Sequence, residues 1–118
     1  MTQLIGKGNQ MAMSSDLMRA TIEMMLLALL KGAASHGYEL AKRAHRRSGG
    51  AVHWGEGALY PALHRLHSKG MVTAKWEGPA AGRKRKVYSL TAKGRRELAA
   101  RAAEWATFAR ATKSILSR

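Results

Sequence analysis

The chain has 118 residues, a length that suits one compact domain with a sizeable core. Its 21 Lys and Arg against 7 Asp and Glu give a formal net charge of +14, which favours a polyanionic partner such as nucleic acid. A hydrophobic content of 46% argues against a disordered basic tail. Because Cys is absent, disulfides, thiolate nucleophiles and Cys-containing metal sites are excluded, which fits the interior of a bacterial cell.

Neither an export signal nor a membrane span is expected. The longest apolar run, residues 24–30, is far below the roughly 20 residues that cross a bilayer. The first residues contain no long apolar stretch that ends in a small-residue cleavage site. Residues 1–13 follow neither a helical nor a strand period, so we expect a flexible tail there. These features predict a cytoplasmic bacterial protein with no membrane partner.

Two helices are predicted in the first half of the chain. Residues 17–31 follow N-cap candidates at 14–16 and are apolar on nearly every side, so this helix should lie between other elements. Ser35 is expected to cap a second helix that runs to about residue 47, and the glycines at 49–50 should end it.

A third helix is predicted over residues 57–69. One face repeats apolar residues at helical spacing: Leu59, Ala62, Leu63 and Leu66. Pro61 lies so early that it should tighten the start of the helix rather than break it. Tyr60, His64 and Ser68 occupy the opposite face, and Arg65 is expected to be exposed with them. This exposed side is either a surface that contacts DNA or an ordinary solvated face.

The last part of the chain predicts a hairpin and a long helix. Residues 71–77 and 83–90 are rich in β-branched and aromatic side chains and flank a turn at 78–82. Thr91 should cap a helix over residues 92–116, roughly 37 Å long. Heptad spacing and its flanks define an apolar seam: Leu98, Ala102, Trp105, Phe108, Ala109, Thr112, Ile115 and Leu116. Such a seam favours a partner helix, so residues 92–118 are interpreted as a dimerisation helix.

The order of these elements predicts the fold class, which is mainly α with a small β-hairpin. Three helices followed by a hairpin match a winged helix-turn-helix domain over residues 14–91, in which the third helix enters the major groove. Four consecutive cations directly after the hairpin turn should reach phosphates or a narrow minor groove: Arg83, Lys84, Arg85 and Lys86. The alternative for these cations is a solvated basic edge strand that prevents aggregation.

Catalytic and metal sites are not expected. His64 and His67 lie one helical turn apart, but no Cys or carboxylate accompanies them, so the pair does not predict a metal site. The sequence has no paired carboxylates, no Gly-rich phosphate loop and no nucleophile beside a His and an acid, so neither an enzyme nor a cofactor is predicted. A non-specific, nucleoid-like nucleic-acid binder remains the alternative function, because charge alone would suffice for it.

Three blocks of sequence resemble the PadR family of bacterial transcriptional regulators. They are HGYEL at residues 36–40, GALYPALHRL at residues 57–66 and GRKRKVYSLT at residues 82–91. The resemblance extends over roughly residues 17–116. A single terminal helix, as predicted here, resembles the arrangement in the short subfamily. It implies a homodimeric repressor of a dyad-symmetric operator, joined through the last helix, that often releases DNA when a small effector binds.

The resemblance also implies site residues. The third helix would read the groove, the second would hold the DNA backbone, and the hairpin would serve as the wing. The candidate DNA-binding residues are Tyr38, Lys42, Arg43, Ala58, Tyr60, Pro61, His64, Arg65, Arg83, Lys84, Arg85 and Lys86. In drug-binding relatives an aromatic residue of the last helix stacks on planar ligands, and Trp105 with Phe108 is similar. These two residues are therefore candidates for binding a small planar hydrophobic or phenolic effector.

Overall fold

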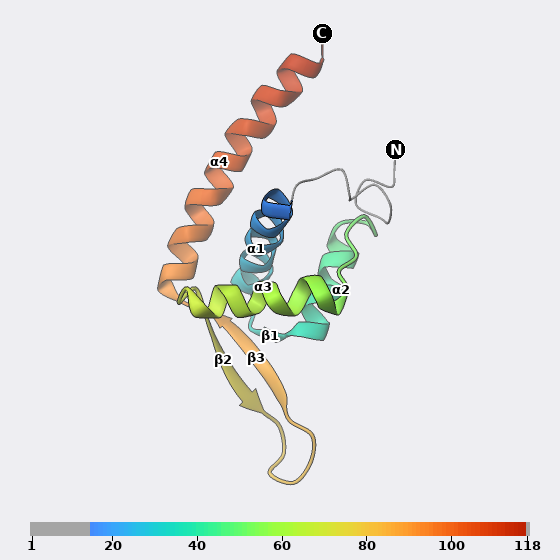
Figure 1. Ribbon diagram of the computed structural model, residues 1–118, viewed down its shortest axis with the longest axis vertical. Helices are drawn as coiled ribbons and strands as arrows, with labels where there is room; N and C mark the ends of the chain where they lie inside the picture. Colours follow the sequence, from blue (N-terminus) through green and yellow to red (C-terminus); the bar gives the residue numbers. More distant parts are fainter. Residues whose placement is uncertain (1–14, 118) are drawn as a thin grey trace.

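The computed structural model describes residues 15–117, and it is mainly helical with a small sheet (Figure 1). The expected tail at residues 1–13 and the cap candidate Ser14 lie outside the described residues. The elements in chain order are α1 (Ser15–Gly32), β1 (Ser35–His36), α2 (Gly37–Arg47), α3 (Glu56–Ser68), β2 (Val72–Glu77), β3 (Arg85–Leu90) and α4 (Ala92–Leu116). The predicted fold class, a winged helix-turn-helix domain with a long C-terminal helix, is confirmed.

The sheet and the start of α2 differ from the sequence prediction. Ser35 does not cap α2, because it lies in β1 and pairs with Tyr88 of β3. The sheet therefore has three antiparallel strands in the order β1-β3-β2, rather than a hairpin alone. The N-cap is His36, whose Nδ1 accepts a hydrogen bond from the Glu39 amide at 3.4 Å. The sequence favoured Ser35 because Ser is the commoner capping residue. It could not indicate β1, because a strand of two residues has no periodicity.

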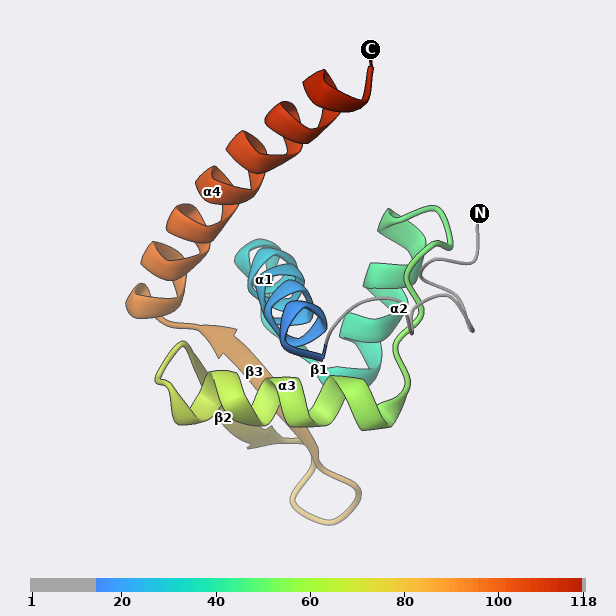
Figure 2. The ribbon, with the colours of Figure 1, turned by 45° about the horizontal axis from the view of Figure 1, so that its top comes forward.

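Helix α1 forms the centre of the protein. Figure 2 shows it between α4 and α2, and it packs against α2, α3, α4 and β3. The prediction that this helix lies between other elements is confirmed. The largest fully buried side chains of the core come from four elements: Leu26, Leu27, Leu40, Leu63, Leu66 and Val72. Among the described residues, no helix has the length and apolar character that a membrane span requires.

Helix α4 joins the core only through its first turns. Thr91 caps it as predicted, because its Oγ1 accepts a hydrogen bond from the Gly94 amide at 3.0 Å. Gly94 packs so closely on the backbone of Met71 that a Cβ at this position would collide with the Met71 carbonyl oxygen. Leu98 and Arg101 still contact the body, and beyond them the helix projects and ends far from it (Figure 1). The closely packed start of α4 thus fixes the direction of its projecting end.

The placement of Leu98 in an open seam is wrong. Its side chain is only 6% exposed and belongs to the core of its own chain. Heptad spacing cannot separate a contact within the chain from one with a partner, because both need the same apolar period. The open apolar part of α4 therefore begins after Leu98.

Candidate nucleic-acid interface

A concave groove of about 750 Å³ lies between the exposed side of α3 and the wing, which comprises β2, β3 and the turn between them. We call it the α3–wing groove. Its lining residues are His36, Gly37, Tyr38, Tyr60, His64, His67, Trp76, Arg83, Lys84, Arg85, Lys86 and Tyr88. Within the described part of the chain, this lining includes no Asp or Glu. The groove therefore carries positive charge on the wing and hydrogen-bonding side chains on α3.

Tyr60 and His64 line this groove from α3, and both are on the exposed side of the helix where the sequence predicts them. Tyr60 is 42% exposed, and its ring lies directly over Gly37 at the start of α2. A Cβ at position 37 would stand 2.7 Å from Tyr60 Cε1, so only Gly leaves room for the ring where it lies. Ala58 is half-buried and Pro61 is exposed, and neither lines the groove.

The wing supplies the cations of the groove. The side chains of residues 83–86 are exposed. Arg85 Nη1 lies 3.1 Å from His36 Nε2, which brings this cation towards α2. Lys86 pairs with Trp76 across the two strands, and its Nζ lies 5.6 Å from the centroid of the indole ring. The aromatic face and the ammonium group attract each other there, so the pair holds Lys86 beside the groove.

Sequence reasoning missed five residues that line the groove: His36, Gly37, His67, Trp76 and Tyr88. The register of the hairpin could have indicated two of them. Trp76 faces Lys86 and Ala74 faces Tyr88, and residues directly opposite each other on antiparallel strands share a face of the sheet. His36 had no such signal, because it enters the groove through the short strand β1.

The cations of α2 that are predicted to contact the DNA backbone surround the carboxylate of Glu39. Glu39 Oε1 lies 3.8 Å from Lys42 Nζ, and its Oε2 lies 3.7 Å from Arg43 Nε and 3.2 Å from Arg46 Nη2. The hydrogen bond from Arg46 lowers the pKa of Glu39. Tyr38 is 66% exposed, with Lys42 Nζ 5.0 Å from its ring centroid. Glu39 therefore holds the cations of α2 in place beside the exposed Tyr38.

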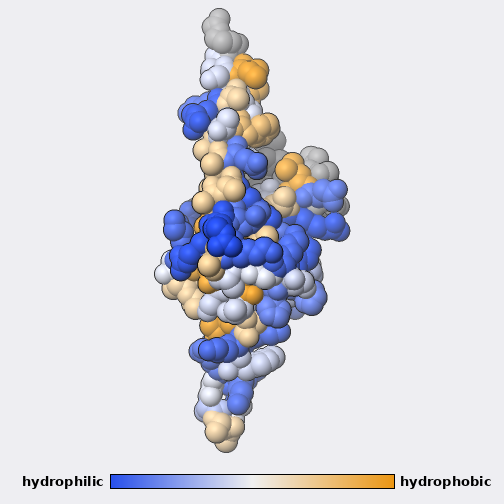
Figure 3. All heavy atoms as spheres, turned by 90° about the vertical axis from the view of Figure 1, so that its left-hand side faces the viewer, coloured by the Kyte–Doolittle hydropathy of each residue, from blue (hydrophilic) through white to orange (hydrophobic). Residues whose placement is uncertain are grey.

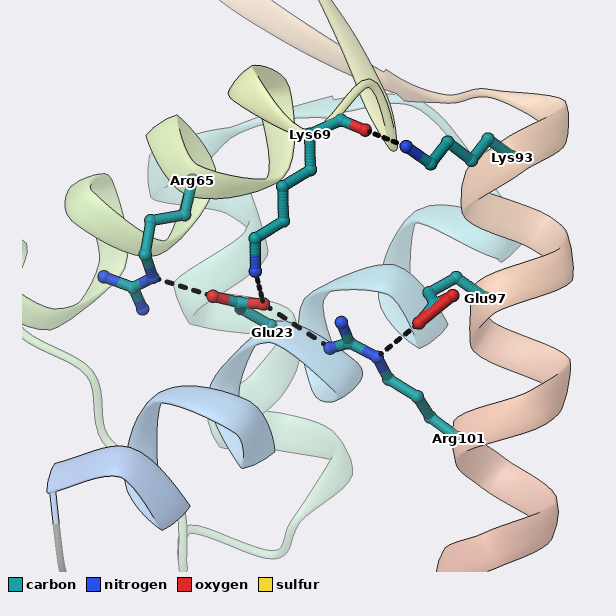
Figure 4. A network of polar contacts seen from close by, with 6 residues as sticks. All are labelled: Glu23, Arg65, Lys69, Lys93, Glu97 and Arg101. Atoms are coloured by element: carbon teal, nitrogen blue, oxygen red, sulfur yellow. Dashed lines mark hydrogen bonds and ion pairs between the residues drawn. The ribbon is translucent and has the colours of Figure 1, made fainter.

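The placement of Arg65 on the exposed side of α3 is wrong. Its Nε donates a hydrogen bond to Glu23 Oε2 of α1 at 2.7 Å, on the side of α3 that packs against the core (Figure 4). Two more cations reach the same carboxylate: Lys69 Nζ at 3.3 Å and Arg101 Nη1 at 3.4 Å from Oε1. Arg65 lies next to His64, and one residue turns a helix by about 100°, which is enough to reverse an assignment near the edge of a face.

Glu23 is a buried acid, with a side chain only 5% exposed. Burial alone would raise its pKa, but the hydrogen bonds and positive charges of Arg65 and Lys69 lower the pKa below its ordinary value. The carboxylate is therefore ionised at neutral pH and bound to cations from two other helices.

This lowered pKa predicts how the free energy of unfolding depends on pH. A carboxyl group whose pKa is lower in the folded state stabilises the protein above its unfolded pKa, and this contribution is lost as the pH falls through the folded pKa. We expect the free energy of unfolding to decrease below about pH 4.5 more steeply in the wild type than in Glu23→Gln. Urea titrations at a series of pH values between neutral and acidic measure it. Parallel pH profiles for the two proteins would contradict the prediction.

The far part of α4 presents an apolar surface that we call the α4 face: Trp105, Phe108, Ala109, Thr112, Ile115 and Leu116. Phe108 is 62% exposed, and Ile115 and Leu116 are each 77% exposed. Trp105 and Phe108 have ring centroids 6.2 Å apart and border a hollow of about 490 Å³ along the helix. Figure 3 shows apolar and hydrophilic residues alternating along this projecting part of the molecule. Ala102, the remaining residue of the predicted seam, is exposed.

No metal-binding cluster is found in residues 15–117, where no three His, Cys, Asp or Glu side chains are suitably grouped. His64 and His67 both face the α3–wing groove, without a carboxylate in its lining. The lining of this groove offers hydrogen-bonding side chains and positive charge.

Comparison with known proteins relates this architecture to transcriptional regulators. The model of the transcriptional regulator PadR-like family matches residues 26–100. A PadR family transcription regulator from Clostridium difficile is 28% identical, with 80% of this chain and 97% of that chain covered and a TM-score of 0.71. A PadR family transcriptional regulator from Eggerthella lenta is also 28% identical, with 86% of each chain covered and a TM-score of 0.73.

A more distant similarity is to Bacillus subtilis PadR, whose structure was solved in complex with operator DNA. The two are 24% identical, with 66% of this chain and 44% of that chain covered and a TM-score of 0.60, so the likeness concerns the fold. Family members are transcriptional regulators and not enzymes. Because the family model spans more than half of the sequence, and the fold agrees with it, this chain belongs to the PadR-like family of transcriptional regulators.

Proposed function

We propose that the chain is a homodimeric repressor that binds a dyad-symmetric operator in double-stranded DNA in the bacterial cytoplasm. Residues 14–91 form its DNA-binding domain and residues 92–118 its dimerisation helix. The observation that carries the proposal is the α3–wing groove, which combines four exposed wing cations with a lining free of carboxylates over the described residues. Phosphate oxygens favour such a surface, and an acidic side chain in it would repel them.

The two sides of the α3–wing groove suggest separate roles, with α3 contacting the bases and the wing contacting the DNA backbone. Helix α3 enters the major groove, where Tyr60 and His64 donate hydrogen bonds to base edges or phosphates. The cations at residues 83–86 bind the backbone or a narrow minor groove beside it. Tyr38, Lys42 and Arg43 hold the backbone from α2. Bacillus subtilis PadR, which shares this fold, was solved in complex with operator DNA, and this supports double-stranded DNA as the partner.

The α4 face supports the homodimer. A single exposed apolar side chain is common on protein surfaces, but a row of them along one projecting helix favours burial against another protein. A second copy of the same helix offers a matching heptad pattern, which an arbitrary partner would not. In such a dimer each operator half-site meets one α3–wing groove.

Trp105 and Phe108 support an effector site in the dimer. They border the hollow along α4 and a second hollow of about 550 Å³ between α1 and α4, which Leu17 and Met24 also line. Aromatic walls of this kind stack on flat apolar rings. We propose a small planar hydrophobic or phenolic molecule as the ligand that releases the DNA.

The test is to measure binding of the purified protein to its own upstream DNA and to scrambled DNA of equal length at several salt concentrations. We expect a preference of about 1,000-fold or more for the operator, because direct base contacts add to phosphate contacts. Tyr60→Ala should lower this preference between about 5-fold and about 150-fold, since one good base contact contributes about 1–3 kcal/mol of discrimination.

Gly37→Ala is a matched variant for this experiment. The added methyl group occupies the place of the Tyr60 ring and displaces it without removing it. The preference for the operator should therefore fall with Gly37→Ala as well, while affinity for scrambled DNA stays unchanged. Equal binding to both DNAs by the wild type, collapsing at higher salt, would instead support the non-specific nucleic-acid binder.

A further inference from the structure

The cations around Glu23 connect the two functional parts of the chain. Arg65 belongs to α3 and Lys69 is the C-cap residue that directly follows this helix, both on the side opposite to the α3–wing groove, and Arg101 belongs to α4. Figure 4 shows these side chains converging from both helices on the one carboxylate of α1. We call this arrangement the Glu23 network. The three cations lie between 42 and 78 residues from Glu23 in sequence.

Both ends of the network are anchored to backbone or to a second acid. Arg101 Nε donates a hydrogen bond to Glu97 Oε1 at 3.2 Å, which fixes the guanidinium group along α4. Lys93 Nζ donates a hydrogen bond to the Lys69 carbonyl oxygen at 2.7 Å, so the end of α3 is also bound to the start of α4. The network therefore restrains α3 relative to α4 by side-chain contacts as well as by the chain connection.

A buried acid is an unusual way to gain stability. Removing a carboxylate from water costs several kcal/mol, and well-packed apolar side chains often stabilise a core equally well. An ion pair adds directional hydrogen bonds, which apolar packing lacks. Arg65 of α3 and the C-cap residue Lys69, four residues later, converge on Glu23, so they restrain the rotation of α3 about its own axis.

Rotation of α3 decides which atoms reach the DNA. A turn of about 15° moves a side-chain tip on the helix surface by roughly 1.4 Å, given the width of a helix. A hydrogen bond to a base edge does not survive such a displacement. Tyr60 and His64 can read bases only while the opposite side of the same helix is held.

We infer that Glu23 is a positioning residue for DNA recognition, which sets the orientation of α3 relative to the dimerisation helix α4 and thereby the fit of the dimer to its operator. This inference rests on the proposed function and adds to it a determinant outside the groove. Glu23 contacts no DNA in this scheme and acts only through Arg65, Lys69 and Arg101. Its loss should therefore reduce discrimination between DNA sequences rather than attraction to DNA in general.

The first test measures orientation without DNA. Because the chain contains no Cys, spin labels attach only at Ser68→Cys on α3 and Thr107→Cys on α4. Labelled chains are mixed with excess unlabelled chains, so that double electron–electron resonance measures the distance between the two labels of one chain. We expect Glu23→Gln to broaden or shift the distance distribution, and the control Arg96→Gln, at an exposed site on α4, to leave it unchanged. An unchanged distribution in Glu23→Gln overturns the inference.

The second test measures the ratio of operator affinity to random-DNA affinity. We expect Glu23→Gln to lower this ratio between about 2-fold and about 30-fold, the range of typical coupling between sites, with random-DNA affinity unchanged. A ratio equal to that of the wild type overturns the inference. If the wild type itself has no operator preference, the proposed function fails, whereas the distance measurement still decides whether Glu23 orients α3.

Arg101→Gln serves as the second variant if Glu23→Gln does not fold. This variant removes the ion pair between Glu23 and α4. Glu23 stays paired with Arg65 and Lys69, so the carboxylate keeps two of its cations. The inference requires this variant also to change the distance distribution and to lower the affinity ratio. A merely stabilising role would lower the free energy of unfolding and leave both of these readouts as in the wild type.

Discussion

Replacing Arg83 and Arg85 together by Ala is expected to weaken binding to every DNA sequence by roughly 30-fold at about 0.15 M salt. Both side chains are exposed on the wing and line the α3–wing groove. Each phosphate contact of a cation releases bound counterions, so the loss of two contacts lowers the slope of log affinity against log salt by about 1.8. Fluorescence anisotropy with operator and scrambled DNA at four or more salt concentrations measures both quantities.

The control for the wing variant removes the same charge elsewhere. Arg95→Ala with Arg96→Ala changes two exposed residues of α4 that do not line the groove. If the wing cations act by direct contact, this control keeps most of the affinity and the original salt slope. A comparable loss in both double variants would show that only the overall charge matters. In the wing variant the ratio between operator and scrambled DNA should stay nearly constant, because phosphate contacts are independent of sequence.

Elements with strong local signals could be predicted from the sequence. Thr91 caps α4 as expected, since a Thr before a helical period is a local signal. The hairpin was predicted from its β-branched and aromatic residues, and the apolar period of α3 placed Leu63 and Leu66 in the core. Each of these predictions depends on residues that lie close together in the sequence.

The predictions that failed depend on contacts between distant segments. Ser35 pairs with Tyr88 of β3, and no pattern near Ser35 indicates that strand. Arg65 turns towards the core because Glu23 of α1 is there, 42 residues away. A lone Glu in an apolar helix does not identify its partners, because the three cations converge on it only after folding. The exposed side of α3 and the wing cations could be predicted from the sequence, whereas the Glu23 network behind α3 could not.

If the α4 face forms the proposed dimer, Trp105→Asp combined with Phe108→Asp is expected to give a folded monomer with much weaker operator binding. Both side chains are more than half exposed in the single chain, so the charges remain solvated in the monomer. In the dimer the same charges would be buried without partners, which costs several kcal/mol. A monomer engages one half-site at a time, and losing the second contact lowers affinity between about 100-fold and about 10,000-fold. Sedimentation equilibrium gives the oligomeric state, and anisotropy gives the affinity.

Two comparisons separate dissociation from unfolding. Leu98→Asp should unfold the chain, because Leu98 lies in its own core and a charge there has no partner. Thr107→Asp adds a charge to the side of α4 opposite the heptad seam and should leave the dimer intact, since Asp can still accept the hydrogen bond that Arg110 donates to Thr107. If the double variant sediments as a dimer, the α4 face is not the interface. If it is a folded monomer that keeps full operator affinity, recognition does not require two copies of the α3–wing groove.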